Sequence, residues 1–214
     1  MRFRDRVDAG RQLADKLRQY ERRSDIVVLA LPRGGVPVGA EVARALDAPL
    51  DVFVVRKLGV PGHPELAMGA IASGGVRVLS RDIIDELRIP DTAIEAVAAR
   101  ERRELERRDR AYRGVRPPPS LGGKIVILVD DGLATGATME AAVAAVRALS
   151  PARVVVAAPV GAPDTCERLR GLADDVVCAQ TPAGFQAVGS WYERFDQTTD
   201  DEVLRTLAVV RSPA

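Results

Sequence analysis

The chain has 214 residues, of which 47% are apolar, so it can build a packed core, and we expect a single domain over residues 1–214. Its 31 basic and 30 acidic residues give a formal net charge of +1, which excludes a global field that would attract nucleic acid or anionic lipid. We therefore expect no nucleic-acid and no membrane partner. The cysteines, Cys166 and Cys178, form no CxxC motif, which favours reduced thiols over a disulfide framework or a zinc site.

The N-terminal stretch is charged and has helical periodicity. Phe3, Val7 and Leu13 recur at roughly helical spacing, which predicts an amphipathic helix over residues 1–20. This stretch lacks the apolar segment of a signal peptide, and no apolar run in the chain approaches the ~20 residues that a membrane helix needs. We therefore expect a cytoplasmic protein.

Apolar runs that suit buried strands alternate with helical patterns along most of the chain. The expected strands are 25–31, 50–58, 124–131, 152–160 and 174–180, with short strand-like pieces at 67–72 and 76–80. The expected helices are 40–46, 138–149, 163–172 and a final one that begins near Thr198 or Thr199. This alternation predicts an α/β fold with a central, mainly parallel sheet flanked by helices.

Residues 81–113 have a helical pattern throughout, and Pro90-Asp91 marks the start of a second, long helix in this arm. Many arginines in the arm suggest an RNA-binding surface. Acidic residues interrupt them, however, and Glu104 with Arg108 or Glu106 with Arg110 have the spacing of helical ion pairs. The pattern therefore favours a solvated helix or one that contacts a second subunit, as in a homodimer.

Three of the expected strands end in loops of unusual composition. These are 31–39 (LPRGGVPVG), 55–66 (VRKLGVPGHPEL), which includes a flexible Gly/Pro segment, and 130–138 (DDGLATGAT). Because ligands of open parallel sheets bind outside the carboxyl ends of the strands, we expect the three loops to converge on one crevice.

The loop after the central strand combines two acids with a run of small residues. The small residues are Ala134, Thr135, Gly136, Ala137 and Thr138. They open a helix, whose free amides and positive dipole end favour a phosphate. Asp130 and Asp131 repel that phosphate, so they must face a group that donates hydrogen bonds, such as a sugar diol. A ribose 5-phosphate satisfies both halves of the motif.

The stretch VILVDDGLATGAT resembles the 5-phosphoribosyl 1-diphosphate (PRPP) signature of the type I phosphoribosyltransferases. LPRGGVPVG is similar to the diphosphate loop of that family, and VRKLG to an Arg-Lys pair that meets the diphosphate in several members. The resemblance covers about residues 24–180 in order and spacing, and it is greatest to small members whose substrate is unassigned. It implies a type I phosphoribosyltransferase-like fold.

The resemblance also implies a set of site residues. The substrate-binding residues would be Arg33, Gly34 and Gly35 for the diphosphate, Asp130 and Asp131 for the ribose hydroxyls, and Gly132, Ala134, Thr135, Gly136, Ala137 and Thr138 around the 5-phosphate. The catalytic residues would be Asp130, Asp131, Arg56, Lys57 and Glu65. The peptide around Arg33 and Gly34 is expected to be strained or cis, as in relatives. Mg²⁺ would be the cofactor, bound through PRPP, with Asp130 or Asp131 as the side chains able to reach it and no other direct side-chain ligand.

Two further segments complete the expected site. The segment from Gly59 to Glu65 is expected to be a mobile lid that brings His63 and Glu65 to the reacting carbon. A small hood made from about residues 1–20 and 181–200 would select the acceptor. In it Trp191 would stack on a planar base, although the aromatic residues there can equally serve to pin the tail to the core.

The expected function is therefore transfer of the phosphoribosyl group of PRPP to a nitrogenous acceptor with release of diphosphate. The sequence does not identify the acceptor, for which a nucleobase is one candidate, and it leaves the role of His63 open. The alternatives are a PRPP-sensing module without turnover and an RNA-binding protein that acts through the arginine-rich helix.

Overall fold

The computed structural model describes residues 1–211, and a five-stranded parallel sheet forms the core. In spatial order its strands are β2 (Leu50–Val52), β1 (Ile26–Ala30), β6 (Ile125–Val129), β7 (Arg153–Val160) and β8 (Asp175–Gln180). All four pairings are parallel, as the strand and helix alternation predicts. Every residue of β1 and β6 is buried, so this sheet is covered on both faces.

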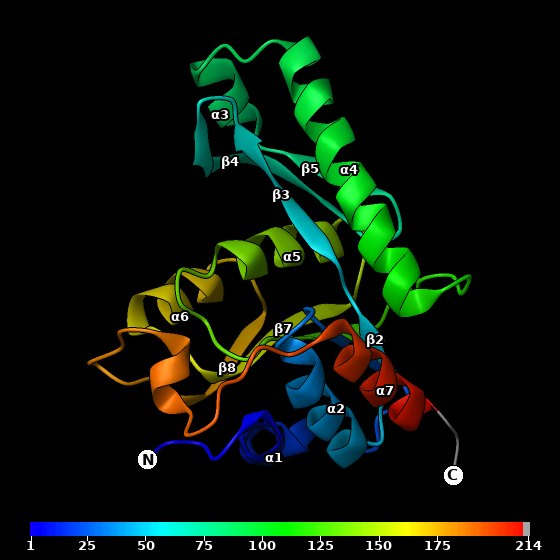
Figure 1. Ribbon diagram of the computed structural model, residues 1–214, viewed down its shortest axis with the longest axis vertical. Coiled ribbons are helices and arrows are strands. Elements are labelled where there is room, and N and C mark those ends of the chain that lie inside the picture. Colours follow the sequence, from blue (N-terminus) through cyan, green and yellow to red (C-terminus); the bar gives the residue numbers. More distant parts are fainter. Residues whose placement is uncertain (212–214) are drawn as a thin grey trace.

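Helices cover both faces of the core sheet (Figure 1). One face carries α1 (Arg6–Lys16), α2 (Gly35–Leu46) and α7 (Asp200–Arg211), and the other carries α5 (Ala137–Arg147) and α6 (Pro163–Arg170). Alternate residues of a strand serve the two sides: Val28 packs toward the first set, and Val27 and Leu29 toward the second.

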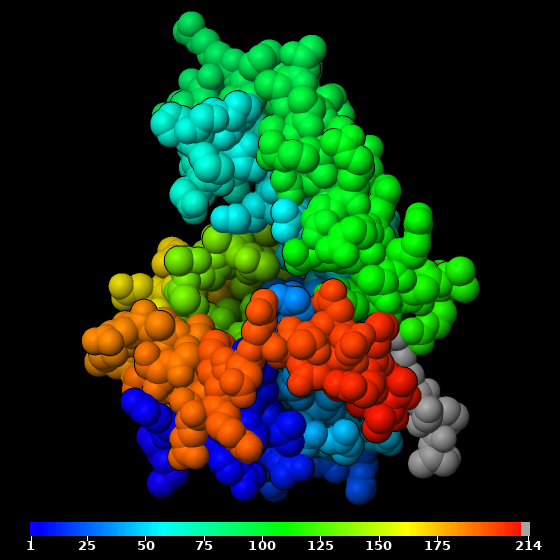
Figure 2. Space-filling view, viewed as in Figure 1, coloured from blue at the N-terminus to red at the C-terminus, as the bar shows by residue number. Residues whose placement is uncertain are grey.

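The chain between β2 and β6 forms a second unit, which we call the outer lobe (residues 55–113). It consists of an antiparallel sheet, with β3 (Val55–Val60), β4 (His63–Ala72) and β5 (Val76–Leu79), followed by α3 (Arg81–Glu86) and α4 (Asp91–Arg113). The lobe stands over α5 at the edge where the core strands end (Figure 1). Figure 2 shows a hollow between the lobe and α5.

Two predictions about this region were wrong. Residues 50–58 are not one strand, because β2 ends at Val52 in the core sheet and β3 begins at Val55 in the outer sheet. The apolar pattern continues from Val52 to Val55, where the chain passes from the core sheet to the outer sheet, so the pattern does not show that the neighbouring strand changes. Residues 59–66, expected as an irregular Gly/Pro segment, form a β-hairpin whose turn is Pro61-Gly62; a proline followed by a glycine with φ of +81° suits a type II turn.

The other expected elements are largely confirmed. The helical arm is present as α3 and α4, and the Glu104–Arg108 ion pair forms at 2.6 Å, whereas Glu106 and Arg110 make none within residues 1–211. The N-terminal helix ends early, at Lys16, and a short 3₁₀ helix (Arg18–Tyr20) follows. A second 3₁₀ helix spans Val188–Trp191. In the part of the chain that is described, every helix is too short or too polar to cross a membrane.

Candidate functional site

The site is built where β1 and β6 end side by side. These strands pair in parallel up to Ala30 and Val129, so the loops that follow them leave the same edge of the sheet. The Leu31 amide donates to the Val129 carbonyl at 2.8 Å and extends the pairing one step into the loops. The 31–39 and 130–138 loops therefore meet, as the sequence predicted.

Two glycines permit this close meeting. A β-carbon on Gly34 would overlap Oδ2 of Asp131, and one on Gly35 would lie 2.7 Å from the Val129 carbonyl oxygen and 3.0 Å from Cα of Asp130. Gly34 has φ of −60° and ψ of −32°, which any residue adopts, so it is the close approach that requires glycine there. The expected diphosphate loop thus packs directly against the expected sugar acids.

The two acids have different surroundings. Oδ1 of Asp130 accepts a hydrogen bond from the Asp131 amide at 2.8 Å, and burial together with the charge of Asp131 raises the pKa of Asp130 well above its usual value. Both side chains are partly exposed, and Oδ2 of Asp131 accepts from Nε of Arg6 at 2.8 Å. The Tyr192 hydroxyl donates to the Asp131 carbonyl at 2.6 Å, which anchors this loop to the C-terminal segment.

The small residues after the acids form the expected amide nest. None of the backbone N–H groups of residues 134–139 donates to an acceptor within residues 1–211, and α5, which begins at Ala137, has no side-chain cap. Thr135 and Thr138 are exposed beside these amides. Such a helix start is a ready-made site for a phosphate.

The nest is held from behind by α6. The Thr165 hydroxyl donates to the Ala134 carbonyl at 2.6 Å, and Arg168 donates to the Thr135 carbonyl at 2.6 Å. With the carbonyl groups bound on the α6 side, the amides of the loop are left for the opposite side. Sequence reasoning missed both residues, because neither lies in a motif and their contacts join positions more than thirty residues apart.

The expected diphosphate loop (residues 31–39) also has backbone amides that are unpaired within residues 1–211, as the nest does. Its Pro32–Arg33 peptide bond is cis, at the segment where the family resemblance placed a strained or cis peptide. The amides of Arg33 and Gly34 make no hydrogen bond to the part of the chain that is described, and α2 follows at once. The Arg33 guanidinium lies 3.9 Å from Asp200 at the start of α7. This loop therefore presents free amides and one cation at the sheet edge.

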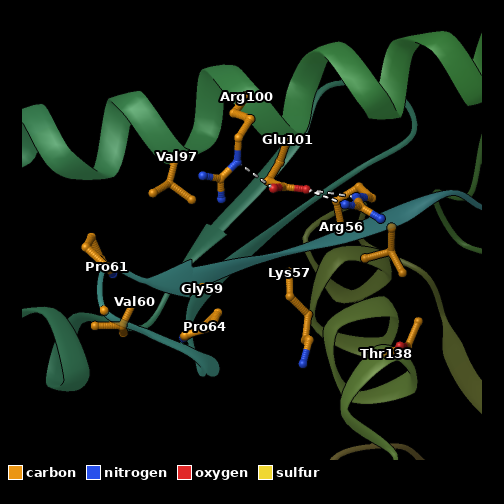
Figure 3. A pocket seen from close by; sticks show the side chains of 12 residues that line it. Arg56, Lys57, Gly59, Val60, Pro61, Pro64, Val97, Arg100, Glu101 and Thr138 are labelled. Carbon is orange, nitrogen blue, oxygen red and sulfur yellow. Dashed lines mark hydrogen bonds and ion pairs between the residues drawn. The ribbon is translucent and has the colours of Figure 1, made fainter.

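A cavity of about 460 Å³ joins the outer lobe to the nest (Figure 3). Arg56, Lys57 and Thr138 all line it. Successive residues of β3 point to opposite faces of the strand: Arg56 bonds Glu101 of α4 at 2.6 and 2.9 Å, whereas Lys57 points toward α5. Lys57 forms no ion pair with any described residue, so it is the free cation beside the nest.

The hairpin tip is open to solvent. His63 and Glu65 are both exposed, and Glu65 lines with Lys57 an adjoining cavity of about 410 Å³ between β4 and α5. A catalytic role for these two residues stays a prediction.

The C-terminal aromatic residues pack mainly against one another and against the N-terminus. Tyr192 is buried, with ring centroids 5.4 Å from Phe3 and 4.8 Å from Phe195. Tyr192 is therefore a packing residue and cannot stack on a base. Trp191 is half-buried, and its indole N–H has no hydrogen-bond partner among residues 1–211. Stacking of an acceptor on Trp191 stays a prediction.

The side chains of the site suit a Mg²⁺ ion that takes most of its ligands from water and from the substrate. The described residues contain no group of three or more His, Cys, Asp or Glu side chains arranged to hold a metal. Asp130 and Asp131 nevertheless supply carboxylate oxygens, the ligand type that Mg²⁺ prefers, and Mg²⁺ keeps waters and takes substrate phosphates as ligands. These residues fit an ion carried by a diphosphate.

This protein has the architecture of the type I phosphoribosyltransferases. Its five parallel strands are flanked by helices, and an acid pair, an amide nest and a glycine loop lie at one edge of the sheet. The chain belongs to the phosphoribosyl transferase family, because the profile of the phosphoribosyl transferase domain matches residues 3–194.

The chain is also similar to relatives of two kinds. The chain is 52% identical over 205 residues to proteins of two Mycobacterium tuberculosis strains that are provisionally named phosphoribosyl transferases; the match covers 96% of this chain and 46% of theirs, so the chain spans about half the length of these relatives. The crystal structure of TT1426 from Thermus thermophilus matches with a TM-score of 0.90 and 47% identity, over 99% of this chain and 100% of that one.

Proposed function

We propose that this protein transfers the 5-phosphoribosyl group of PRPP to a nitrogenous acceptor and releases diphosphate. The observation that carries the proposal is the direct packing of the Asp130–Asp131 pair against the glycines of the diphosphate loop, beside the row of free amides at 134–139. One sugar with a phosphate at each end matches this order of groups along the sheet edge.

Each end of such a ligand would meet complementary chemistry. The carboxylates of Asp130 and Asp131 would accept hydrogen bonds from the ribose hydroxyls, and the α5 amides with Thr135 and Thr138 would bind the 5-phosphate. The amides of Arg33 and Gly34 and the ammonium of Lys57 would bind the diphosphate. Binding both ends fixes the anomeric carbon between them, so that the acceptor can approach it.

Departure of the diphosphate develops negative charge on the leaving group. Mg²⁺, when bound to the diphosphate, neutralises part of that charge. The free amides and Lys57 supply fixed donors at the same place, and closure of the segment from Gly59 to Glu65 would exclude water from it. The acceptor would enter beside the hood, where it would stack on the half-buried ring of Trp191. We expect the reaction to serve nucleotide metabolism in the cytoplasm. We also predict that α4 forms the interface of a homodimer.

The test is a titration of PRPP in the presence and absence of Mg²⁺, followed by an assay of diphosphate release over purine, pyrimidine and nicotinate acceptors. Wild-type protein should bind Mg²⁺-PRPP and release diphosphate with one acceptor class. The double variant Asp130→Asn with Asp131→Asn should lose binding. Asp82→Asn, which changes an exposed acid of α3, is the matched control and should behave as wild type.

The outcomes separate the alternatives. Binding of PRPP without release on any acceptor would make the protein a PRPP-sensing module. No binding of PRPP would refute the proposal, and retention of RNA that depends on Arg103, Arg107 and Arg110 would replace it.

A further inference from the structure

Arg6, at the start of α1, joins three segments that are far apart in the sequence. Its Nε donates to Oδ2 of Asp131 at 2.8 Å, and its Nη1 donates to the Asp196 carbonyl at 2.7 Å. The guanidinium carbon lies 4.0 Å from the centroid of the Phe195 ring. The Arg6 side chain is 13% exposed, so this position is held by packing as well as by charge.

The contact with Arg6 decides how the Asp131 carboxylate is presented. Oδ2 lies between the Arg6 guanidinium and Gly34, where no β-carbon fits. Oδ1 accepts no hydrogen bond from the part of the chain that is described. The main chain of Asp131 is fixed separately, by the hydroxyl of Tyr192. One oxygen is therefore clamped against the diphosphate loop, and the other is left with free acceptor capacity.

We propose that Arg6 is a positioning residue of the sugar site: it clamps one oxygen of Asp131 so that the other faces a ribose hydroxyl. The inference rests on the proposed function, because it assigns Arg6 to the same PRPP site. Arg6 would act through Asp131 and need not touch the sugar itself. A fixed carboxylate forms its hydrogen bond without the entropy cost of ordering, which is how preorganisation increases affinity.

A purely structural role for Arg6 predicts something different. If Arg6 only ties the C-terminal segment to α1, its loss would loosen the hood and weaken every ligand alike. The chain offers a control for that effect, because Arg194 also ties the C-terminal segment to the start of α1, with its Nη2 2.6 Å from Asp5 Oδ2, although it is more exposed, and it does not contact the acids of the site.

The experiment compares two stable carbocyclic analogues of PRPP, one with both ring hydroxyls and one without them, by calorimetric titration with Mg²⁺. Arg6→Gln should weaken the hydroxylated analogue about 10-fold or more, the size expected for a hydrogen bond to a charged group, and change the other little. Arg6→Lys keeps the charge but not the planar fork, so its loss should be intermediate. Arg194→Gln should bind both analogues as wild type does.

A double variant ties the effect to Asp131. In the Asp131→Asn background, Arg6→Gln should add little, because the group through which Arg6 acts is already gone. Equal weakening of both analogues, or an unchanged affinity for the hydroxylated one, would overturn the positioning role. Failure of the wild type to bind either analogue would overturn the proposed function itself, and the two failures are therefore distinguishable.

Discussion

Arg56 and Lys57 are neighbours in β3 and point to opposite sides of the outer sheet. Both line the cavity between the outer lobe and the nest, but Arg56 is paired with Glu101 at 2.6 Å, whereas Lys57 points toward α5 (Figure 3). The sequence pattern grouped the two residues as one diphosphate-binding pair. The alternation of a strand separates them, so the structure gives them different surroundings and predicts different effects of their loss.

We expect Lys57→Ala to weaken Mg²⁺-PRPP binding about 10-fold or more with little loss of stability, since it removes a cation that forms no ion pair with any described residue. Arg56→Ala should instead lower the free energy of unfolding by about 1–2 kcal/mol, a value reduced for the partial exposure of the pair. Titration of PRPP and chemical denaturation of both variants measure the two effects. The prediction would be wrong if Lys57→Ala lost stability and Arg56→Ala lost PRPP affinity instead.

The contribution of the Arg56–Glu101 pair should depend on pH. Burial favours a higher pKa for Glu101, but hydrogen bonds from Arg56 and Arg100 outweigh it and bring the pKa below its usual value. A depressed pKa in the folded state means that the stabilisation is present above the unfolded value of about 4.3 and is lost as the pH falls through the folded value. The stability difference between wild type and Arg56→Ala should therefore be full at neutral pH and shrink below about pH 4.3. A difference that does not change down to acid pH would argue against an ionised pair.

Gly34→Ala tests the packing of the two loops. The new methyl group would overlap Oδ2 of Asp131, displace the carboxylate and break its bond to Arg6. We expect PRPP affinity to fall at least about 10-fold, as for loss of a charged hydrogen bond, while the fold persists because the backbone conformation suits alanine. Gly122→Ala is the control, since nothing lies within 4 Å of its β-carbon position. Normal PRPP binding by Gly34→Ala would show that the acid can move without consequence.

Thr165→Val tests the support of the amide nest from α6. The substitution keeps the shape of a buried side chain and removes the hydrogen bond to the Ala134 carbonyl. We expect a loss of about 1 kcal/mol in stability and a several-fold weaker affinity for the 5-phosphate end, measured with ribose 5-phosphate. Thr206→Val is the control, because the Thr206 hydroxyl donates to the Glu202 carbonyl on α7, on the other face of the core sheet. If Thr165→Val and Thr206→Val changed the affinity for ribose 5-phosphate equally, Thr165 would have no specific role in holding the nest.

The sequence predicted those parts of the fold that are written locally. Periodicity and start signals located β1, β6 and α4, and the PRPP signature placed Asp130 and Asp131 at a strand end. The crossing from β2 to β3 was missed, because the apolar pattern of Val52 to Val55 is the same whether the next strand pairs in the core or in the outer sheet. Arg6 was missed for a similar reason. Its contact with Asp131 spans 125 positions, and no local pattern distinguishes it from the other arginines near the N-terminus.

The two cysteines allow a prediction about reactivity. Their sulfur atoms lie 3.2 Å apart, on α6 and β8, and the hydrogen bond between them lowers the pKa of Cys166 to about 7 and raises the pKa of Cys178. Since the thiolate is the reactive form, small hydrogen peroxide molecules that reach the buried Cys166 should oxidise it to a sulfenic acid faster as the pH rises through about 7. The Cys178 thiol would then condense with it, forming a disulfide and releasing water.

Mass spectrometry of peroxide-treated protein across a pH series checks both steps. In Cys178→Ala the partner thiol is absent, so the midpoint of Cys166 oxidation should move up toward the ordinary thiol value of about 8.5, and the product should stop at the sulfenic acid or its higher oxides. Cys166→Ala should form no disulfide. An unchanged midpoint in Cys178→Ala would mean that the short sulfur contact does not carry the hydrogen bond that lowers the Cys166 pKa.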